Sequence, residues 1–322
     1  MTARVEVLAP GPYATVQDLG RPGYAHLGVP RSGAADPPSL RLANRLVANA
    51  ETAAGIELTL GGAALRFTAG AWVAVTGAPC PVEAAGRAAG TDAPLWVPPG
   101  GVLRVGVPRR GLRTYVAVRD GIGVERVLGS RSTDSLSGIG PPPLRAGTTL
   151  PVGAGAVAAA ILADFAAPPP LPRRPVVRVL PGPRDDWFVP EALTALCAAA
   201  YEVTADSNRV GARLRGAPLE RARAGELASE GMPLGAVQVP PGGQPIVFLA
   251  DHPPTGGYPV VCVVAAADLP MVAQARPGDL LRFRLVRRAS HDRASHDRAS
   301  HDRATARHRE AVDRPGGACQ EA

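Results

Sequence analysis

The chain has 322 residues, 46% of them hydrophobic and 20% charged, which excludes a wholly disordered protein and suffices for about two domains. All 35 basic residues are Arg, and the absence of Lys excludes a Walker-A phosphate loop and a lysine nucleophile. The net charge of +7 comes from scattered arginines in a chain with only 4% aromatic residues, so no nucleic-acid partner is expected.

Short apolar segments separated by turn residues predict a mainly β protein. Gly and Pro number 37 and 35, too many for a helical bundle, and they favour short strands in a barrel or sandwich. In chain order, the predicted strands are Val5–Leu8, Gly55–Leu60, Trp72–Thr76, Val102–Val107, Thr114–Val118, Val176–Leu180, Ile246–Leu249, Val260–Ala265 and Leu280–Val286. Two helices are predicted, Pro38–Ala48 with Asp36 as its cap and Pro190–Ala200.

A proline-rich segment divides the body of the chain. Phe165–Pro175 has five prolines in eleven residues, which cannot continue a helix or a strand ladder. We therefore predict an N-terminal domain at 1–165, a linker at 166–175 and a C-terminal domain at 176–287. The remainder, 288–322, contains three tandem Ala-Ser-His-Asp-Arg repeats at Ala289–Arg303 and is predicted to be disordered.

Neither a membrane segment nor a metal centre is expected. The first ten residues contain Arg4 and Glu6 rather than an apolar signal sequence, and Gly and Pro interrupt the longer uncharged runs, so a cytoplasmic protein is expected. The four cysteines form no Cys-x-x-Cys pair. Only His26 and His252 lie outside the tail, and no Gly-x-Ser-x-Gly motif is present, so neither a serine triad nor a two-histidine metal site is expected.

Four polar segments that contain glycine stand out from the apolar background: Thr15–Tyr24, Gly28–Asp36, Asp206–Gly211 and Asp251–Pro259. Each alone is more typical of a turn, because Gly, Asn, Asp and Pro suit turn backbones. Arg21 and Arg209 are exceptions, since a guanidinium beside glycine backbone suits a carboxylate or phosphate. Asp251 and His252 are expected to point to opposite faces of a strand rather than to form a dyad.

The motifs of the chain are similar to those of one protein family. In order they read TVQDLGRPGYAHLGVPRSGAAD, LANRLV, ELTLGG, VAVTGA, YVAVRDGI, VLGSRST, VLPGP, SNRVGARLRG, SEGMPLGAVQVP, DHPPTGGYPVV and AQARPGDLLRF. From about Val5 to Val286 they resemble the biotin-dependent carboxyltransferase family. That family includes the C subunit of 5-oxoprolinase, kinase-inhibitor antagonist proteins and the second allophanate-hydrolase-like domain of urea carboxylase. The resemblance implies two tandem cyclophilin-like β-barrel domains with few short helices.

The resemblance also implies an activity and partners. It implies the C subunit of an ATP-dependent 5-oxoprolinase, a hydrolase that converts the cyclic amide 5-oxoproline to glutamate together with an A subunit, and with a B subunit that is similar to kinase inhibitors. Because the chain has no Lys, we expect the ATP phosphates to be handled wholly or partly by the partners. Two alternatives stay open. One is a biotin-dependent carboxyltransferase component for a urea-like amide, with biotin on a separate carrier; the other is a non-catalytic antagonist of a kinase-inhibitor protein.

The family motifs imply particular site residues in this chain. The implied catalytic residues are Asp18, Arg21, Arg209 and Asp251, the arginines for a carboxylate or phosphate and the aspartates for proton transfer or ring-nitrogen contact. The implied substrate-binding residues are Gln17, Ser32, Asp36, Asn208, Gln238, Thr255, Gly256, Gly257 and Tyr258. The chain departs from the family at Asn208, where Asp is usual, and at Pro253 and Pro254, where Gln and Thr are usual. The lost carboxylate at residue 208 weighs against acid–base chemistry there.

Overall fold

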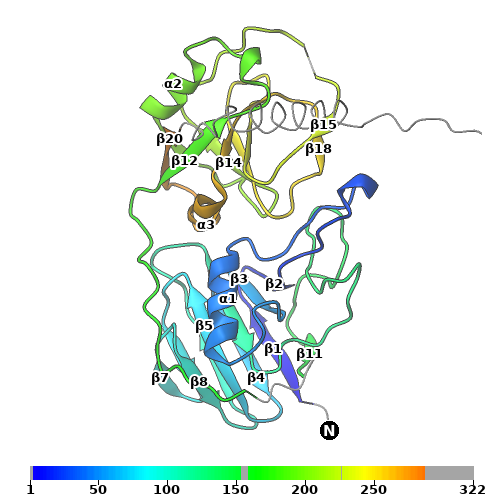
Figure 1. The fold of residues 1–322 in the computed structure, drawn as a ribbon. Helices are drawn as coiled ribbons and strands as arrows, with labels where there is room; N and C mark the ends of the chain where they lie inside the picture. Colours follow the sequence, from blue (N-terminus) through cyan, green and yellow to red (C-terminus); the bar gives the residue numbers. More distant parts are fainter. Residues whose placement is uncertain (1–2, 154–158, 226, 287–322) are drawn as a thin grey trace, which may run out of the picture. The chain divides into compact units, whose positions relative to one another are not determined.

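Two antiparallel sheets form the first half of the chain in the structure, a computed structural model that describes residues 3–153, 159–225 and 227–286 (Figure 1). The six-stranded sheet has the order β11 (Thr149–Pro151), β1 (Arg4–Pro10), β4 (Ala63–Phe67), β9 (Val102–Val105), β6 (Val82–Ala84) and β7 (Arg87–Ala89). The five-stranded sheet has the order β2 (Tyr13–Gln17), β3 (Gly55–Thr59), β10 (Arg113–Val118), β5 (Ala71–Gly77) and β8 (Pro94–Val97).

A single hydrophobic core joins these two sheets. Val7 of β1 and Val116 of β10 are both fully buried in it. All residues of β10 are buried, because α1 (Pro37–Leu46) covers the other face of its sheet, where Ala117 packs near Leu46. A strand that is covered on both faces does not need to alternate apolar and polar residues, which explains the continuous run Tyr115–Val118 in the sequence.

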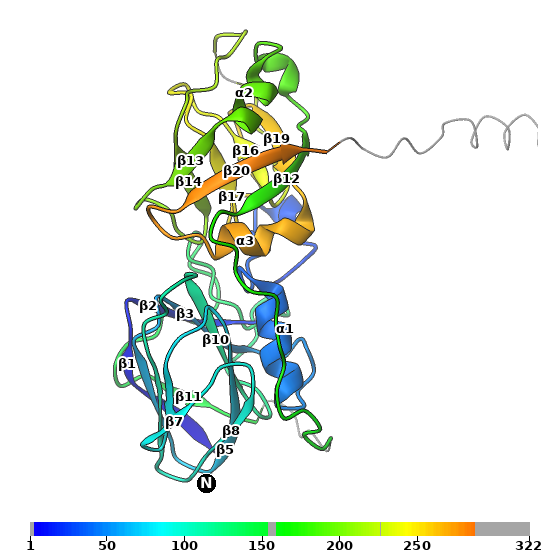
Figure 2. The same ribbon diagram turned by 90° about the vertical axis from the view of Figure 1, so that its left-hand side faces the viewer.

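The second half of the chain is a closed seven-stranded barrel (Figure 2). Its strands follow the order β12 (Val176–Pro181), β19 (Val260–Val264), β16 (Ala236–Gln238), β17 (Ile246–Phe248), β14 (Gly211–Arg215), β13 (Ala200–Val203) and β20 (Leu280–Leu285). The β12–β20 pair is parallel, whereas the other pairs in the barrel are antiparallel. Closure removes the exposed sheet edges that would otherwise invite aggregation.

Short elements complete both halves. They are η1 (Ala25–Leu27) before α1, and η2 (Asp185–Trp187), α2 (Ala192–Ala198), β15 (Glu230–Gly231), β18 (Thr255–Gly256), η3 (Ala266–Asp268) and α3 (Leu269–Ala273) in the second half. The two-residue strands β15 and β18 pair with each other outside the barrel. Helix α2 packs on β20.

The structure confirms all nine predicted strands and both predicted helices, with some shifted ends. The predicted Asp36 cap is present, because its Oδ1 accepts the Ser39 N–H at 3.2 Å. The second helix is shorter than predicted, since Ala199 is already extended and the chain enters β13 at Ala200. Sequence patterns missed the other strands and α3, each of which has two to five residues, because a segment this short carries little periodicity by which to distinguish it from a loop.

Residues Met1–Val286 form one compact unit. Within the described ranges, no sheet combines strands from both sides of the predicted linker at 166–175. That segment contacts the first half, for example where the Ala166 N–H donates to the Asp92 carbonyl at 2.8 Å. The division into domains at 1–165 and 176–287 remains a prediction. The disorder predicted for 288–322 concerns residues outside the described ranges.

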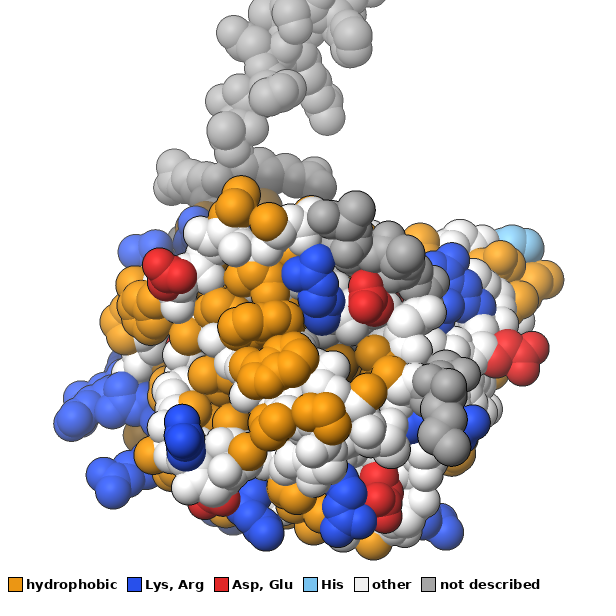
Figure 3. All heavy atoms as spheres, turned by 90° about the horizontal axis from the view of Figure 1, so that it is seen from below, with side chains coloured by type: hydrophobic (Ala, Val, Ile, Leu, Met, Phe, Trp, Pro, Cys, Tyr) orange, Lys and Arg blue, Asp and Glu red, His pale blue; other side chains and the backbone are white. Residues whose placement is uncertain are grey.

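Hydrophobic side chains gather on the face that Figure 3 shows, with arginines around them. The exposed large hydrophobic residues of the first half include Trp72 and Trp96, which are 37% and 49% exposed. They are directly opposite in the β5–β8 pair, and their ring centroids are 5.6 Å apart. Aromatic cross-strand pairs of this kind stabilise a sheet even on its solvent side.

Candidate functional site

A buried cluster of four charges joins the two halves. Arg209, just before β14, donates from Nε and Nη2 to the two carboxylate oxygens of Asp251, at 2.8 and 2.9 Å. Its Nη1 donates to Glu57 Oε1 on β3, and Arg113 Nε on β10 lies 3.4 Å from the same oxygen. No side chain of the four is more than 3% exposed, so water screens these pairs little.

Strand register and a backbone bond place these charges. Glu57 and Tyr115 are opposite each other in the β3–β10 pair, and the Tyr115 hydroxyl donates to Glu57 Oε2 at 2.7 Å. In the second half, Asp251 follows β17, and its N–H donates to the Arg209 carbonyl at 3.0 Å. This bond brings the two loops together, so the bidentate ion pair forms between them.

Pairing keeps the cluster charged. Burial by itself would raise the pKa of Asp251 and of Glu57, but the Arg209 guanidinium outweighs it and holds both pKa values below their usual range. Burial would likewise lower the pKa of Arg209, but the two carboxylates raise it instead. Two cations and two anions therefore balance within the cluster.

Asp251 also binds two serines of the first half. Ser32 Oγ lies 2.7 Å from Oδ1, and Ser135 donates from its N–H and its Oγ to Oδ2, at 3.0 and 2.6 Å. Ser32 has a φ of 54°, a left-handed conformation that costs energy in a residue other than glycine. Since both Asp251 oxygens are already occupied by several donors, this carboxylate is better suited to positioning its neighbours than to exchanging a proton.

Asp18 holds the 127–140 loop, which carries Ser135. Its Oδ1 accepts from the hydroxyls of Ser130 and Ser132, both at 2.6 Å. Its Oδ2 accepts the Arg131 N–H at 2.7 Å. A carboxylate with this many donors stabilises a loop conformation, and the proton-transfer role predicted for Asp18 stays a prediction.

Arg21 and Gln17 bind the same loop through its backbone. Arg21 Nη2 donates to the Ser132 carbonyl, and Gln17 Nε2 donates to the Thr133 carbonyl at 2.9 Å. Ser32 Oγ lies 2.9 Å from that second carbonyl. Arg21 is 1% exposed, and burial lowers its pKa. The first two polar segments of the sequence thus meet at one loop.

Asp36 connects helix α1 with the second half. Its Oδ2 accepts Gln274 Nε2 at 2.8 Å, while Gln274 Oε1 accepts the N–H groups of Leu112 and Arg113, both at 2.9 Å. Burial raises the pKa of Asp36, although the hydrogen bonds from Gln274 and Ser39 act against it. Asp36 is therefore both a helix cap and part of the junction between the halves.

Asn208 closes the turn in front of β14. Its Oδ1 accepts the N–H groups of Val210 and Gly211, at 2.8 and 3.4 Å. This Asx-type turn needs a side-chain oxygen but no charge, so Asn can replace the Asp that is usual in the family without losing the turn. Asn208 itself is exposed.

The remaining predicted residues form a separate group in the second half. Gln238 Nε2 donates to the Tyr258 carbonyl at 2.9 Å. Thr255 and Gly256 form β18, and the Gly257 carbonyl accepts a backbone N–H at 3.1 Å. Among the hydrogen bonds of the described residues, none links this group to Asp251. The structure thus brings together the first three polar segments and the start of the fourth.

Two cavities adjoin the charge cluster. The His252 cavity has a volume of about 310 Å³ and is lined by Ser32, His252, Arg31 and Arg41 together with apolar residues of both halves. The imidazole of His252 is 8% exposed, and its Nδ1 lies 2.8 Å from the Pro253 carbonyl oxygen. Asp251 and His252 lie in a turn rather than on a strand, and they form no hydrogen-bonded dyad.

The Tyr13 cavity is the second of these, with a volume of about 460 Å³. Its lining includes Tyr13, Arg113, Ser135, Asn208 and Arg209. Burial raises the pKa of the Tyr13 phenol, so this hydroxyl remains protonated at neutral pH. Both cavities therefore present a serine that is held by Asp251.

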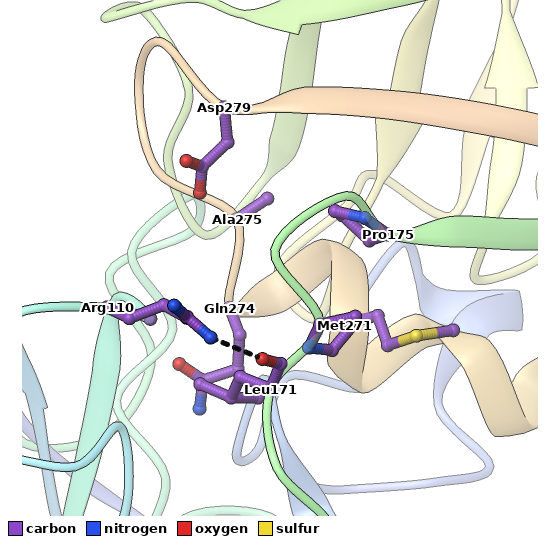
Figure 4. A pocket seen from close by; sticks show the side chains of 9 residues that line it. Arg110, Leu171, Pro175, Met271, Gln274, Ala275 and Asp279 are labelled. Carbon is purple, nitrogen blue, oxygen red and sulfur yellow. Dashed lines mark hydrogen bonds between the residues drawn. The ribbon is translucent and has the colours of Figure 1, made fainter.

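Two other hollows lie away from the charge cluster. A cavity of about 520 Å³ separates α1 from the proline-rich segment. A niche of only about 20 Å³ surrounds Gln274 and Met271, beside the hydrogen bond from Arg110 Nη1 to the Leu171 carbonyl at 3.1 Å (Figure 4). The niche has room for about one water molecule, so it is a packing gap rather than a binding site.

Within the described ranges, no three His, Cys, Asp or Glu residues are grouped to hold a metal ion. The same ranges contain no helix that is long and apolar enough to cross a membrane.

The sequence matches one protein family along most of its length. Residues 27–285 match the family described as carboxyltransferase domain, subdomain A and B. The chain belongs to this family.

Relatives of the carboxyltransferase chain fall into two groups. It is 37% identical to the 5-oxoprolinase C subunit of Escherichia coli over 87% of this chain and 90% of that protein. The Haemophilus influenzae protein of the same name is 33% identical, with 88% and 91% covered. Urea amidolyase of Lachancea kluyveri is 34% identical over 86% of this chain but only 17% of that protein.

Two solved structures also match most of the chain. TTHA0988 superposes with a TM-score of 0.78 at 38% identity, covering 88% of this chain and 55% of that one. The Kluyveromyces lactis urea amidolyase superposes with a TM-score of 0.83 at 32% identity, covering 89% and 19%. The carboxyltransferase chain thus spans about half of one solved relative and about a fifth of the other.

Sequence analysis missed several residues of the site. Glu57, Arg113 and Gln274 lie within or beside family motifs, yet none was selected as a site residue. The signal that could have revealed Glu57 is its position as the one charged residue in the predicted strand Gly55–Leu60. A buried charge needs a partner, but its partner here is Arg209 in the other half, which no local pattern reveals.

Proposed function

We propose that this carboxyltransferase-family chain is the C subunit of an ATP-dependent 5-oxoprolinase complex, which hydrolyses 5-oxoproline to glutamate with the help of its A and B subunits. The proposal rests on how much of each relative's length the chain matches. The chain matches 90% and 91% of two proteins named as the C subunit of 5-oxoprolinase, but only about a sixth of the urea amidolyases.

The charge cluster supports a site at the junction of the halves. Arg209 and Asp251 are saturated by each other, by Glu57 and by the two serines, so they form a rigid frame rather than free reactive groups. We propose that this frame fixes Ser32 in the His252 cavity and Ser135 in the Tyr13 cavity. Preorganised groups of this kind stabilise developing charge without reorganisation during the reaction.

The reaction itself needs an activated amide. Transfer of the ATP γ-phosphoryl group to the lactam oxygen would release ADP and make the ring carbon electrophilic. Water would then add to this carbon, and the C–N bond would break to give a free amine and an acyl phosphate. A second water would hydrolyse the acyl phosphate to the glutamate carboxylate and phosphate. The chain has no Lys and no phosphate loop, which supports phosphate handling by the partner proteins. Arg21 and Arg209 were the candidates for a shared role, but both are buried and bonded within the chain, so a phosphate contact by either would require these bonds to open.

Reconstitution tests this function. The A and B subunits are assayed for ATP-dependent glutamate release from 5-oxoproline, with and without the chain. We expect release only with the chain, and a loss of activity for Arg209→Ala. Unchanged release by Arg21→Ala and Arg209→Ala variants that bind the partners would remove both arginines from the mechanism. No release despite stable assembly would contradict the proposed function.

A second function is favoured by the family description and by the urea amidolyase relatives. It is carboxyl transfer from biotin on a separate carrier protein to a urea-like amide. Decarboxylation of carboxybiotin that depends on both the chain and the amide would support it, and this assay is run on the same preparation.

A further inference from the structure

The two cavities differ in their uncompensated charge. In the Tyr13 cavity, Arg113 and Arg209 are neutralised by Glu57 and Asp251 within the buried cluster. The His252 cavity also presents two arginines, but among the described residues that line it none is acidic. An anion therefore gains more from entering the His252 cavity than from entering the Tyr13 cavity.

The two arginines of the His252 cavity are less fully compensated than those of the Tyr13 cavity. Arg31 is exposed and forms no ion pair with any described residue. Arg41 Nε lies 3.7 Å from Glu51, a carboxylate that Arg45 already meets at 2.7 Å. Each guanidinium suits a carboxylate, which it can bind through two parallel hydrogen bonds.

The histidine supplies an acceptor in the same cavity. The Pro253 carbonyl can only accept a hydrogen bond, so the 2.8 Å contact requires the proton on Nδ1 of His252. In the neutral ring, Nε2 then carries a lone pair, and it has no hydrogen-bond partner among the described residues. Burial lowers the pKa of His252, which favours this neutral form at pH 7.

The remaining walls limit the size of the ligand. Most of the other lining residues are Ala, Leu or Pro, including Leu249 and Leu269. A volume of about 310 Å³ is at the lower end for ligand pockets and suits a small ring. The cavity thus combines cationic groups, one neutral acceptor and apolar contacts.

We propose that the His252 cavity binds a small cyclic amide that bears one carboxylate, with Arg31 and Arg41 at the carboxylate and His252 Nε2 accepting the amide N–H. The choice of 5-oxoproline as the probe rests on the proposed function. The assignment makes Arg31, Arg41 and His252 binding residues of the site, and it leaves the Tyr13 cavity to another component of the reaction.

Calorimetric titration of the full chain with 5-oxoproline and with 2-pyrrolidinone tests the carboxylate contact. The second compound is the same lactam without the acid. We expect 5-oxoproline to bind at least about tenfold more tightly, and the double variant Arg31→Gln/Arg41→Gln to lose this preference. The matched control is Arg104→Gln. Arg104 on β9 is exposed and its Nε also lies 3.7 Å from a glutamate, Glu83, but it does not line the His252 cavity. Equal binding of both lactams, or an unaffected double variant, overturns the proposal.

Nitrogen NMR of the imidazole tests the acceptor. In the free chain, we expect the His252 signals of a neutral ring protonated on Nδ1, and a shift of Nε2 on addition of 5-oxoproline. His252→Asn keeps a donor for the Pro253 carbonyl but lacks Nε2, so it identifies the signals and should weaken binding. An unperturbed His252 in the presence of saturating 5-oxoproline contradicts the assignment.

Parallel glutamate-release assays separate the two hypotheses. If the complex converts 5-oxoproline while the double arginine variant keeps a wild-type KM, the cavity assignment fails and the proposed function stands. If the chain binds 5-oxoproline through these residues but the assembled complex releases no glutamate, the cavity assignment stands and the proposed function fails.

Discussion

At the residue scale, Arg209 links more of this molecule than any other side chain of the charge cluster. It contacts Asp251 in its own half, and Glu57 and the Gly33 carbonyl in the other. Removing one member of a buried ion pair leaves its partner charged and dehydrated, which costs more than the pair itself contributes. The junction between the halves therefore depends on this guanidinium.

Replacement of Arg209 by Gln should lower the free energy of unfolding by about 3–5 kcal/mol, because Glu57 and Asp251 lose their shared cation. Urea denaturation measures the change. Arg215→Gln is the matched control, since Arg215 also pairs with a carboxylate at 2.8 Å but is 69% exposed, and its loss should change stability little. Equal effects of the two variants would show that the buried pair adds no special stability.

The lowered pKa values of Asp251 and Glu57 predict a loss of stability in acid. A carboxylate with a lower pKa in the folded state contributes its full stabilisation above its unfolded pKa, about 4, and loses it as the pH falls toward the folded pKa. Urea denaturation between pH 7 and pH 3 should show this fall. In Arg209→Gln the fall should be shallower, because the cation that lowers both pKa values is gone; parallel curves would contradict this origin.

At the element scale, the loop of residues 28–36 depends on close backbone contacts. Gly33 has a φ of +95°, and a Cβ there would come within 2.7 Å of the Gly20 nitrogen. Its carbonyl accepts Arg209 Nη2 at 2.6 Å. Glycine is thus required at this position both for its conformation and for its small size.

Gly33→Ala should lower the unfolding free energy by roughly 2–4 kcal/mol, because conformational strain adds to a backbone clash. Gly23→Ala is the control for strain alone. Its φ is +98°, but nothing lies within 4 Å of the added Cβ, so about 1 kcal/mol is expected. Thermal denaturation of both variants gives the comparison, and an equal cost would remove the close approach as a cause.

At the scale of the whole molecule, the last strand of the described residues, β20, ends at Leu285. There β20 pairs with β12 and β13 and completes the barrel, and the carboxyltransferase family match also ends at residue 285. The charge cluster and both cavities that adjoin it consist of described residues before this point. Every residue assigned to the site thus precedes the repeats in the sequence.

A chain that ends at Val286 should keep the full thermal stability and, in the reconstituted complex, the full rate of glutamate release. Calorimetry and the glutamate assay on the shortened and complete chains measure both quantities. A lower melting temperature or a lower rate in the shortened chain would assign a role to the repeats that neither the fold nor the family match indicates.

Local sequence determined much of the secondary structure of this protein. Apolar runs such as Val176–Leu180 and the Asp36 cap depend on neighbours a few residues away, and both were predicted correctly. The family motifs likewise indicated Ser32, Arg209 and Asp251, which the structure brings together.

Tertiary structure alone decided which side chains meet across the halves. Glu57 and Arg209 are 152 residues apart, so no periodicity connects them. The barrel also depends on long-range pairing of short strands such as β16, whose three residues were not recognised as a strand from the sequence. Which arginines are neutralised within the buried cluster and which line the His252 cavity followed only from the fold, because compensation depends on distance in space.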